Sequence, residues 1–142
     1  MKTKTLTNRA GILCYKPVEN QVNRYECYEQ IDLNTHCAKT WPIEYEFMWH
    51  TINESGGQSS KQYGEQLNRQ GRKKGVADWC VMIPIGKYHG MYLELKRCHS
   101  GSITKEQKAF IKRQSELGYF CCVAYGFRAA LKAIDDYLTG KV

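Results

Sequence analysis

Residues 75–96, with the sequence GVADWCVMIPIGKYHGMYLELK, decide the fold expected for this chain. Two apolar runs, 80–84 and 91–95, flank a turn-like segment that contains two glycines. This pattern predicts two antiparallel strands joined as a hairpin. Because side chains alternate between the two faces of a strand, Glu94 and Lys96 are expected on the same face.

Asp78 stands just before the first of these strands, where a hairpin in register brings it to the same space as Glu94 and Lys96. An ion pair on a solvated sheet face would explain Glu94 and Lys96 without any function, and such a pair contributes little stability. The apolar neighbours instead indicate central strands under a helix, where charges are costly unless they are paired or bind a metal. An Asp, a Glu and a Lys in this arrangement suit metal-dependent phosphodiester cleavage.

Length and charge limit the class of protein. The chain has 142 residues, which suits one domain with a single core. Its formal net charge is +7, and 12% aromatic and 25% charged residues are typical of a globular protein. The positive charge favours an anionic partner, and nucleic acid is the simplest candidate. The alternative interpretation is a charge that serves solubility alone.

Seven cysteines occur without a C-x-x-C pair or a zinc-finger spacing. Their odd number and apolar surroundings favour reduced thiols in a cytosolic protein. A structural zinc site that uses Cys98 with His99, or His36 with Cys37, is the weaker alternative. No signal-peptide pattern is present and no apolar run approaches the roughly 18 residues of a membrane span, so we expect a soluble, cytoplasmic protein without a membrane partner.

The chain divides into an arm and one domain. Residues 1–22 are polar apart from a patch at 10–15, so we expect an extended N-terminal arm with room for one edge strand. A single domain then covers 23–142. Its expected elements are a helix over 23–40, a strand over 46–50, a loop over 53–60, a helix over 62–70, the two hairpin strands, a helix that starts after Thr104, a strand over 119–125 and a helix over 127–138.

A full helix separates the second hairpin strand from the strand over 119–125, so these two strands are expected to be parallel. At the start of that helix, Thr104 and Gln107 have the spacing of a capping box. The fold class is therefore α/β, a central mixed β-sheet flanked by helices in the order α-β-α-β-β-α-β-α.

Several ordered motifs resemble those of one nuclease family. They are GVADW at 75–79, GMYLELK at 90–96, ITKEQ at 103–107, LGY at 117–119, HTINE at 50–54 and the basic run RKK at 72–74. Together they resemble the VRR-NUC (virus-type replication-repair nuclease) family of the PD-(D/E)xK superfamily, over roughly residues 24–138. Ala77 departs from the family's usual proline at that position. The resemblance implies a restriction-endonuclease-like core in a standalone, phage-type member.

The resemblance assigns metal ligands. It implies that Asp78, Glu94 and the backbone carbonyl of Leu95 bind a divalent ion, magnesium (Mg2+) or manganese (Mn2+). Two carboxylates and a carbonyl leave open positions for a phosphate oxygen and a water, which agrees with the coordination that magnesium prefers. Lys96 would orient that water, lower its pKa or neutralise charge that develops on the phosphate, and the sequence leaves these roles open.

Two further catalytic residues follow from the resemblance. Glu26 matches the family's N-terminal acidic residue, which binds the metal directly or through water, and Gln30 matches the Gln one turn later. Glu29 is the competing position, and both acids are also favoured by the dipole at a helix N-terminus. Gln107 matches the family's active-site Gln, although its place in the capping box explains it equally well.

Arg72, Lys73 and Lys74 precede the catalytic strand and are expected to contact DNA phosphates. The alternative is a solvated basic surface. His50 is a further cleft candidate, although a lone histidine is more often structural.

The leading hypothesis is a metal-dependent DNA endonuclease. Phage-type relatives imply branched DNA, including four-way (Holliday) junctions, as the substrate, and the cytoplasm of a bacterial host as the location. Paired nicks need two active sites, so a homodimer is expected. The alternatives are a nuclease with flap, nicking or restriction-like preference, a non-catalytic nucleic-acid-binding module of the same fold, and a small zinc-stabilised interaction protein.

Overall fold

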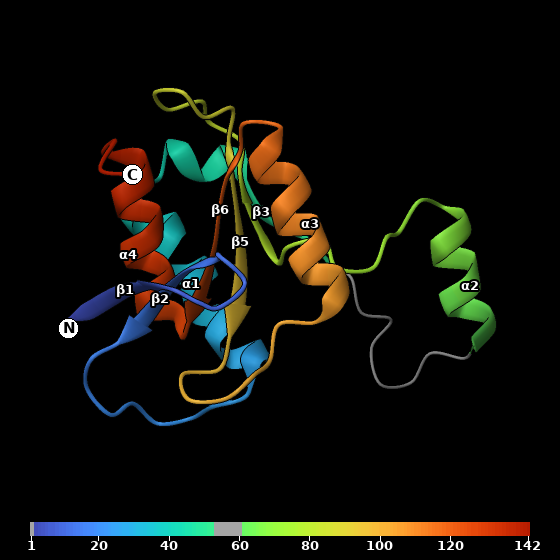
Figure 1. Ribbon diagram of the computed structural model, residues 1–142, viewed down its shortest axis with the longest axis horizontal. Helices are drawn as coiled ribbons and strands as arrows, with labels where there is room; N and C mark the ends of the chain where they lie inside the picture. The colour runs from blue at the N-terminus through green and yellow to red at the C-terminus, as the bar shows by residue number, and fades with distance from the viewer. Residues whose placement is uncertain (1, 53–60) are drawn as a thin grey trace.

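A computed structural model describes residues 2–52 and 61–142, which form a six-stranded sheet with helices on both faces (Figure 1). The strand order is β1-β2-β6-β5-β4-β3. The elements are β1 (Thr3–Thr7), β2 (Leu13–Pro17), α1 (Glu26–Thr40), the 3-10 helix η1 (Glu44–Phe47), β3 (Met48–His50), α2 (Lys61–Arg69), β4 (Trp79–Val81), β5 (Met91–Lys96), α3 (Lys105–Glu116), β6 (Phe120–Tyr125) and α4 (Phe127–Leu138).

The hairpin and the mixed sheet expected from the sequence are both present. β4 and β5 are antiparallel, with Trp79 opposite Leu93, and β5 and β6 are parallel. A parallel pair needs a crossover connection, and α3 supplies it. β5 and β6 lie in the middle of the sheet, so the fold prediction of a mixed α/β sheet is confirmed.

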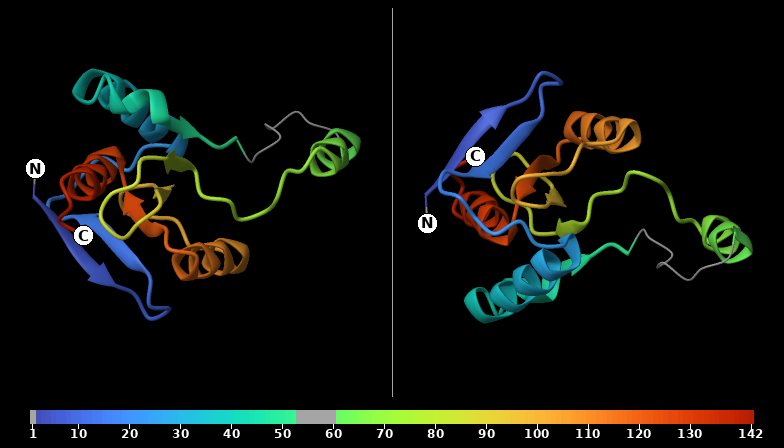
Figure 2. Two further views of the ribbon diagram at one scale, coloured as in Figure 1. Left: turned by 90° about the horizontal axis from the view of Figure 1, so that it is seen from above. Right: turned by 90° about the horizontal axis from the view of Figure 1, so that it is seen from below.

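The helices divide the core into two layers (Figure 2). On one face, Leu33 of α1 and Ile134 of α4 pack with Leu93 and Leu95 of β5. On the other face, Ile111 of α3 packs in a smaller cluster with side chains of β2 and β6. Glu94 and Lys96 alternate with Leu93 and Leu95, so they belong to the α3 face of the sheet. The short helix α2 stands apart from these layers (Figures 1 and 2).

The N-terminal residues differ from the expected arm with one edge strand. Residues 3–17 form two strands, and β2 pairs in parallel with β6, with Cys14 opposite Val123. Cys14 and Tyr15 are buried. The N-terminal segment is therefore part of the sheet and its core, because the β2 backbone pairs with the edge of β6 that would otherwise be exposed, and β2 side chains are buried.

Smaller differences concern element boundaries. The first half of the strand expected over 46–50 belongs to η1, and the loop expected over 53–60 lies outside the described residues. Leu117 falls at the helical spacing of the buried Phe110 but is exposed, since it caps the end of α3. No helix in the described part of the chain is long and apolar enough to cross a membrane.

Candidate active site

A cleft of about 640 Å³ opens where the start of α1, the end of β3, the segment 74–78 and the start of α3 meet. All five residues predicted to be catalytic from the sequence line this cleft, together with one of the three predicted phosphate contacts, Lys74. The catalytic five are Glu26, Asp78, Glu94, Lys96 and Gln107. Their elements are far apart in the sequence, so the fold is what brings them together.

Hydrogen bonds hold both the backbone and the side chain of Asp78. Its backbone oxygen accepts hydrogen bonds from the backbone N–H of Thr51, at 2.8 Å, and from the ring Nδ1 of His50, at 2.7 Å. Its carboxylate Oδ2 accepts the backbone N–H of Leu95, at 2.9 Å. These contacts place the carboxylate beyond the last β4–β5 pair, Trp79 with Leu93, at the point where β5 runs on without β4.

Leu95 presents its carbonyl to the same space. The N–H and the C=O of one strand residue point to the same edge of the strand. The N–H of Leu95 points toward Asp78, so its carbonyl does so as well. This geometry agrees with the role that the sequence motif predicts for the Leu95 carbonyl.

Glu94 and Lys96 are buried charges that form an ion pair. Only 2% of Glu94 and 7% of Lys96 is exposed, and Lys96 Nζ lies 3.0 Å from Glu94 Oε1. An ion pair on a solvated sheet face, the alternative considered from the sequence, is therefore excluded by burial. Charges at this depth persist only with matched partners or a bound ion.

The two carboxylates disturb each other's protonation. Burial first, and then the negative charge of Asp78, raise the pKa of Glu94 to about 8, although Lys96 opposes this rise. Burial also raises the pKa of Asp78, against the hydrogen bond from Leu95 and the charge of Lys96. Burial alone would lower the pKa of Lys96, but the carboxylates of Glu94, Glu26 and Asp78 together outweigh burial and keep this pKa above its usual value. Lys96 is therefore a cation, and the raised pKa of Glu94 means that this single cation does not offset the burial of two neighbouring carboxyl groups.

Gln107 joins the start of α3 to this ion pair. Its side-chain Oε1 accepts the backbone N–H of Thr104, at 2.9 Å, while its own N–H donates to Thr104 Oγ1, which completes the predicted capping box. Oε1 also accepts from Lys96 Nζ, at 3.3 Å, and Nε2 donates to Glu94 Oε1. Because the Thr104 N–H can only donate, Oε1 must face it, and this leaves Nε2 for Glu94. The capping and active-site positions of Gln107 thus coexist.

Gly75 sets the distance between the segment before Asp78 and α3. Its φ is +82°, a conformation that residues with a side chain rarely adopt. A Cβ atom there would lie 2.4 Å from the carbonyl carbon of Glu106 and 2.8 Å from the backbone nitrogen of Gln107. Only glycine allows this close approach of two backbones.

The structure separates Glu26 from Glu29. Glu26 and Gln30 line the cleft, and the charge of Glu26 acts on both Glu94 and Lys96. The Gln30 Nε2 atom is buried without a hydrogen-bond partner in the described structure. Glu29 points to the other side of α1, so it is Glu26 that has the position expected of the helix acid.

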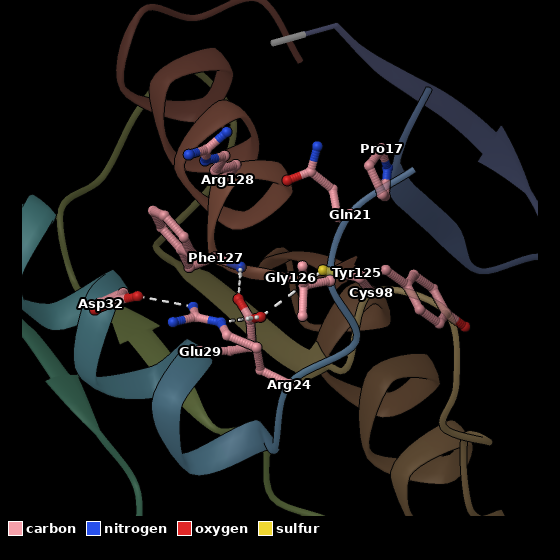
Figure 3. A pocket seen from close by; sticks show the side chains of 11 residues that line it. Pro17, Gln21, Arg24, Glu29, Asp32, Cys98, Tyr125, Gly126, Phe127 and Arg128 are labelled. Atoms are coloured by element: carbon pink, nitrogen blue, oxygen red, sulfur yellow. Dashed lines mark hydrogen bonds and ion pairs between the residues drawn. The ribbon is translucent and has the colours of Figure 1, made fainter. Parts of the chain in front are cut away.

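Glu29 has a structural position of its own (Figure 3). Its Oε2 accepts the backbone N–H of Phe127, at 2.7 Å, at the start of α4, and its Oε1 lies 3.2 Å from Arg24 Nε. Arg24 extends to Asp32, at 2.7 Å, and the Cys98 thiol donates to Glu29 at 3.8 Å. A cavity of about 290 Å³ borders this cluster. The Phe127 N–H and Arg24 satisfy the buried Glu29 carboxylate, so removal of Glu29 would leave both groups without this partner.

The basic run at 72–74 is divided. Arg72 donates to Asn68 Oδ1, at 3.0 Å, and to the backbone oxygen of Gly64, at 3.2 Å, so its guanidinium is engaged at the end of α2. Lys74 lines the cleft and Lys73 is exposed. The phosphate contacts expected of these residues stay predictions, and Lys74 is the one placed at the cleft.

Sequence reasoning missed part of the lining. Thr51 and Val76 line the cleft, and neither carries a side chain that signals chemistry. His50, considered only as a weak candidate, lines it as well. The signal that would have found them is their place within the motifs HTINE and GVADW, next to His50 and close to Asp78.

The donor atoms suit a hard divalent cation. In residues 2–52 and 61–142, no three His, Cys, Asp or Glu side chains form a group that could hold a metal ion by themselves. The cleft instead offers two carboxylates, from Asp78 and Glu94, and the carbonyl of Leu95. Magnesium binds through one or two carboxylates and keeps several waters, so this set fits magnesium or manganese. The raised pKa values of both acids are of the kind that a nearby cation relieves.

The comparison with solved structures supports the fold. No protein-family model matches the chain, and no curated protein matches it. Among solved structures, the chain is similar to a "VRR_NUC domain protein", with a TM-score of 0.72 and 21% sequence identity. The similarity covers 84% of this chain and 92% of that chain. The chain therefore has the fold of a VRR-NUC domain protein, as its motifs predict.

Proposed function

We propose that the protein is a metal-dependent nuclease that hydrolyses phosphodiester bonds in DNA. The observation that carries the proposal is the convergence of Asp78, Glu94 and Lys96, two of them buried, in one cleft of a VRR-NUC-like fold. A buried ion pair with a second carboxylate beside it is a poor way to stabilise a fold. The same three groups are well placed for phosphoryl chemistry.

Asp78, Glu94 and the Leu95 carbonyl would hold the divalent ion. When bound, magnesium or manganese supplies a Lewis acid for the phosphate and lowers the pKa of a bound water. The protein's contribution is to hold the ligands still. The Leu95 N–H orients the Asp78 carboxylate, and Gln107 Nε2 orients that of Glu94. Glu26 adds a further acid at the rim of the cleft.

Lys96 acts as a cation. Its ammonium group is paired with Glu94, and its pKa stays above the usual value, so it does not serve as a general base. A fixed positive charge can orient the attacking water, lower its pKa or neutralise charge on the phosphate, so it can serve each of the roles considered from the sequence. The Gln107 Oε1 atom keeps the ammonium beside the cleft.

The proposed substrate is branched DNA, including four-way junctions. This finer assignment rests on the phage-type motifs, and the net charge of +7 and the position of Lys74 support an anionic substrate. Two paired nicks in a junction need two active sites, so we propose a symmetric homodimer.

The test is a substrate panel. Labelled four-way junction, flap and linear duplex DNA are incubated with the protein in magnesium or manganese, beside the Lys96→Ala variant. We expect wild-type cleavage that prefers junctions and is lost in the variant. Equal cleavage of linear duplex would overturn the substrate assignment and leave the chemistry standing. Binding of every substrate without cleavage would replace the enzyme with a DNA-binding module of the same fold.

A further inference from the structure

A row of residues runs across the sheet from the catalytic lysine to the N-terminal hairpin. Lys96 on β5 is opposite Tyr125 on β6. β2 pairs with β6 through Tyr15 and Ala124, so the next residue, Lys16, comes beside Tyr125, and its Nζ lies 4.6 Å from the centre of the Tyr125 ring. Lys4 on β1 is directly opposite Lys16.

This row lies on the same face and at the same end of the sheet as the cleft. Residues opposite one another in neighbouring strands share a face, so Lys4 and Lys16 lie on the α3 face with Lys96. Lys16 and Lys96 both stand near the carboxyl ends of parallel strands. Neighbouring strands are about 4.8 Å apart, so three steps place the Lys4 backbone ~14 Å from that of Lys96. That span corresponds to about four nucleotides at ~3.4 Å each along one DNA strand.

The hairpin concentrates positive charge without neutralising it. Residues 2–18 contain four basic residues and no acidic one; the basic residues are Lys2, Lys4, Arg9 and Lys16. Two like charges directly opposite each other destabilise a strand pair. No carboxylate among residues 2–52 and 61–142 forms an ion pair with Lys4 or Lys16. An arrangement that costs stability in the isolated protein indicates an anionic partner.

Both lysines are accessible to such a partner. Lys4 is exposed, and Lys16 is half-buried, with its ammonium over the Tyr125 ring. The contact with the ring restrains Lys16, and its side chain remains partly exposed to a phosphate oxygen. Strand pairing fixes the two charges next to each other, so they present a rigid pair to a polymer of phosphates.

We propose that Lys4 and Lys16 form a phosphate-binding surface on the same sheet face as Lys96, and that this surface contacts the backbone of the DNA substrate about four nucleotides from the scissile bond. The proposal rests on the proposed function, because the row defines a path only for a polymer whose phosphodiester lies at Lys96. Lysine contributes point charges to phosphate, so the surface adds affinity without sequence preference.

The test compares two double variants that each remove two positive charges. Lys4→Gln with Lys16→Gln changes the proposed surface, whereas Lys39→Gln with Lys141→Gln changes exposed positions of α1 and of the C-terminus, on the opposite face of the sheet. DNA binding is measured by fluorescence anisotropy over a range of salt concentrations in EDTA, and single-turnover cleavage is measured at saturating DNA in magnesium. A third variant, Lys4→Glu, converts the like-charge pair into an ion pair and so keeps the hairpin folded, which thermal melting checks.

We expect the Lys4/Lys16 variant to lower the slope of log affinity against log salt by about 2, with about tenfold weaker binding per lysine near 0.1 M salt. The Lys39/Lys141 control keeps the wild-type slope, affinity and single-turnover cleavage rate. Lys4→Glu is expected to bind DNA more weakly without a lower melting temperature. A structural role for Lys4 would instead lower the melting temperature.

A Lys4/Lys16 variant with the wild-type slope and affinity overturns this surface while wild-type cleavage keeps the nuclease proposal standing. If the wild type binds DNA but never cuts it, and the Lys4/Lys16 variant loses binding, the surface is supported and the nuclease proposal is overturned. A wild-type protein that does not bind DNA overturns both.

Discussion

Replacement of Gly75 by alanine is expected to disturb the candidate active site through the backbone alone. A Cβ atom at this position would lie 2.4 Å from the carbonyl carbon of Glu106. Carbon atoms in ordinary contact stay about 3.5–4.0 Å apart, so the segment before Asp78 and the start of α3 must separate by ~1 Å. Gln107 moves with α3, and its hydrogen bonds to Glu94 and Lys96 lengthen.

Two costs combine in the Gly75→Ala variant. The positive φ of an alanine costs on the order of 1–3 kcal/mol, and overpacking costs about 1–3 kcal/mol more. We therefore expect a loss of roughly 3 kcal/mol in the free energy of unfolding, measured by urea denaturation. A misplacement of ~1 Å in a catalytic site costs about 100-fold in rate, and single-turnover DNA cleavage is expected to fall by that order.

Gly86→Ala is the matched control. Gly86 also has a positive φ, of +56°, but a Cβ atom there meets nothing within 4 Å, and the residue lies at the far end of β4 and β5 from the cleft. This variant is expected to lose about 1–2 kcal/mol of stability and to keep its cleavage rate. Equal losses of stability and of activity in the two variants would refute the reasoning, because the contact with α3 would then have no measurable effect.

Three further results are expected. Gln107→Ala and Thr104→Ala are both expected to lose the capping box and about 1 kcal/mol of stability. Only Gln107→Ala is expected to lose cleavage at saturating DNA. Equal loss of cleavage in both variants would contradict a role of Gln107 in the active site. In the metal-free protein the raised pKa of Glu94 stabilises the folded state, fully below pH 4.5, and this contribution is lost as the pH rises through about 8. Urea titrations over this range should show the free energy of unfolding falling by up to ~1.4 kcal/mol per pH unit. The Glu94→Gln variant should show a smaller slope. Glu29→Ala leaves the Phe127 N–H and Arg24 without their buried partner and is expected to cost ~3–5 kcal/mol in the free energy of unfolding. Glu26→Gln is expected to keep this free energy within ~0.5 kcal/mol of wild type and to lose cleavage. The reverse pattern would exchange the roles of the two acids.

The hairpin and the central ion pair were predictable because local rules decide them. Alternation along 91–96 places Glu94 and Lys96 on one face, and the turn-like segment before Met91 sets the antiparallel partner. The capping box at Thr104 is equally local, since its two residues are three positions apart. Features that depend on a few neighbouring residues are therefore recovered.

The choice between Glu26 and Glu29 was not settled by local rules. Both acids stand in the first turn of α1, where the dipole favours either of them. The rotation of α1 is decided by its buried contacts, Leu33 and Cys37, with the sheet and α4. A family motif favoured Glu26, and tertiary packing places it at the cleft.

The N-terminal strands show where sequence reasoning fails. Residues 3–7 read as a polar arm, because an edge strand has one face in solvent and few apolar side chains. The strand that makes this segment part of the fold is β6, and Cys14 pairs with Val123, more than 100 positions along the chain. Nothing near residue 14 in the sequence indicates that partner.

The central claim is that Asp78, Glu94 and Lys96 form a metal-dependent site for phosphodiester cleavage. The most direct test is single-turnover cleavage of a labelled four-way junction by the wild type and by Asp78→Asn, each in magnesium and in EDTA. The substitution keeps the shape of the side chain and an oxygen that can accept the Leu95 N–H, but removes a charged ligand. The account predicts cleavage by the wild type in magnesium alone, and none by Asp78→Asn. Wild-type cleavage that persists in EDTA, or an Asp78→Asn variant as active as the wild type, would contradict it.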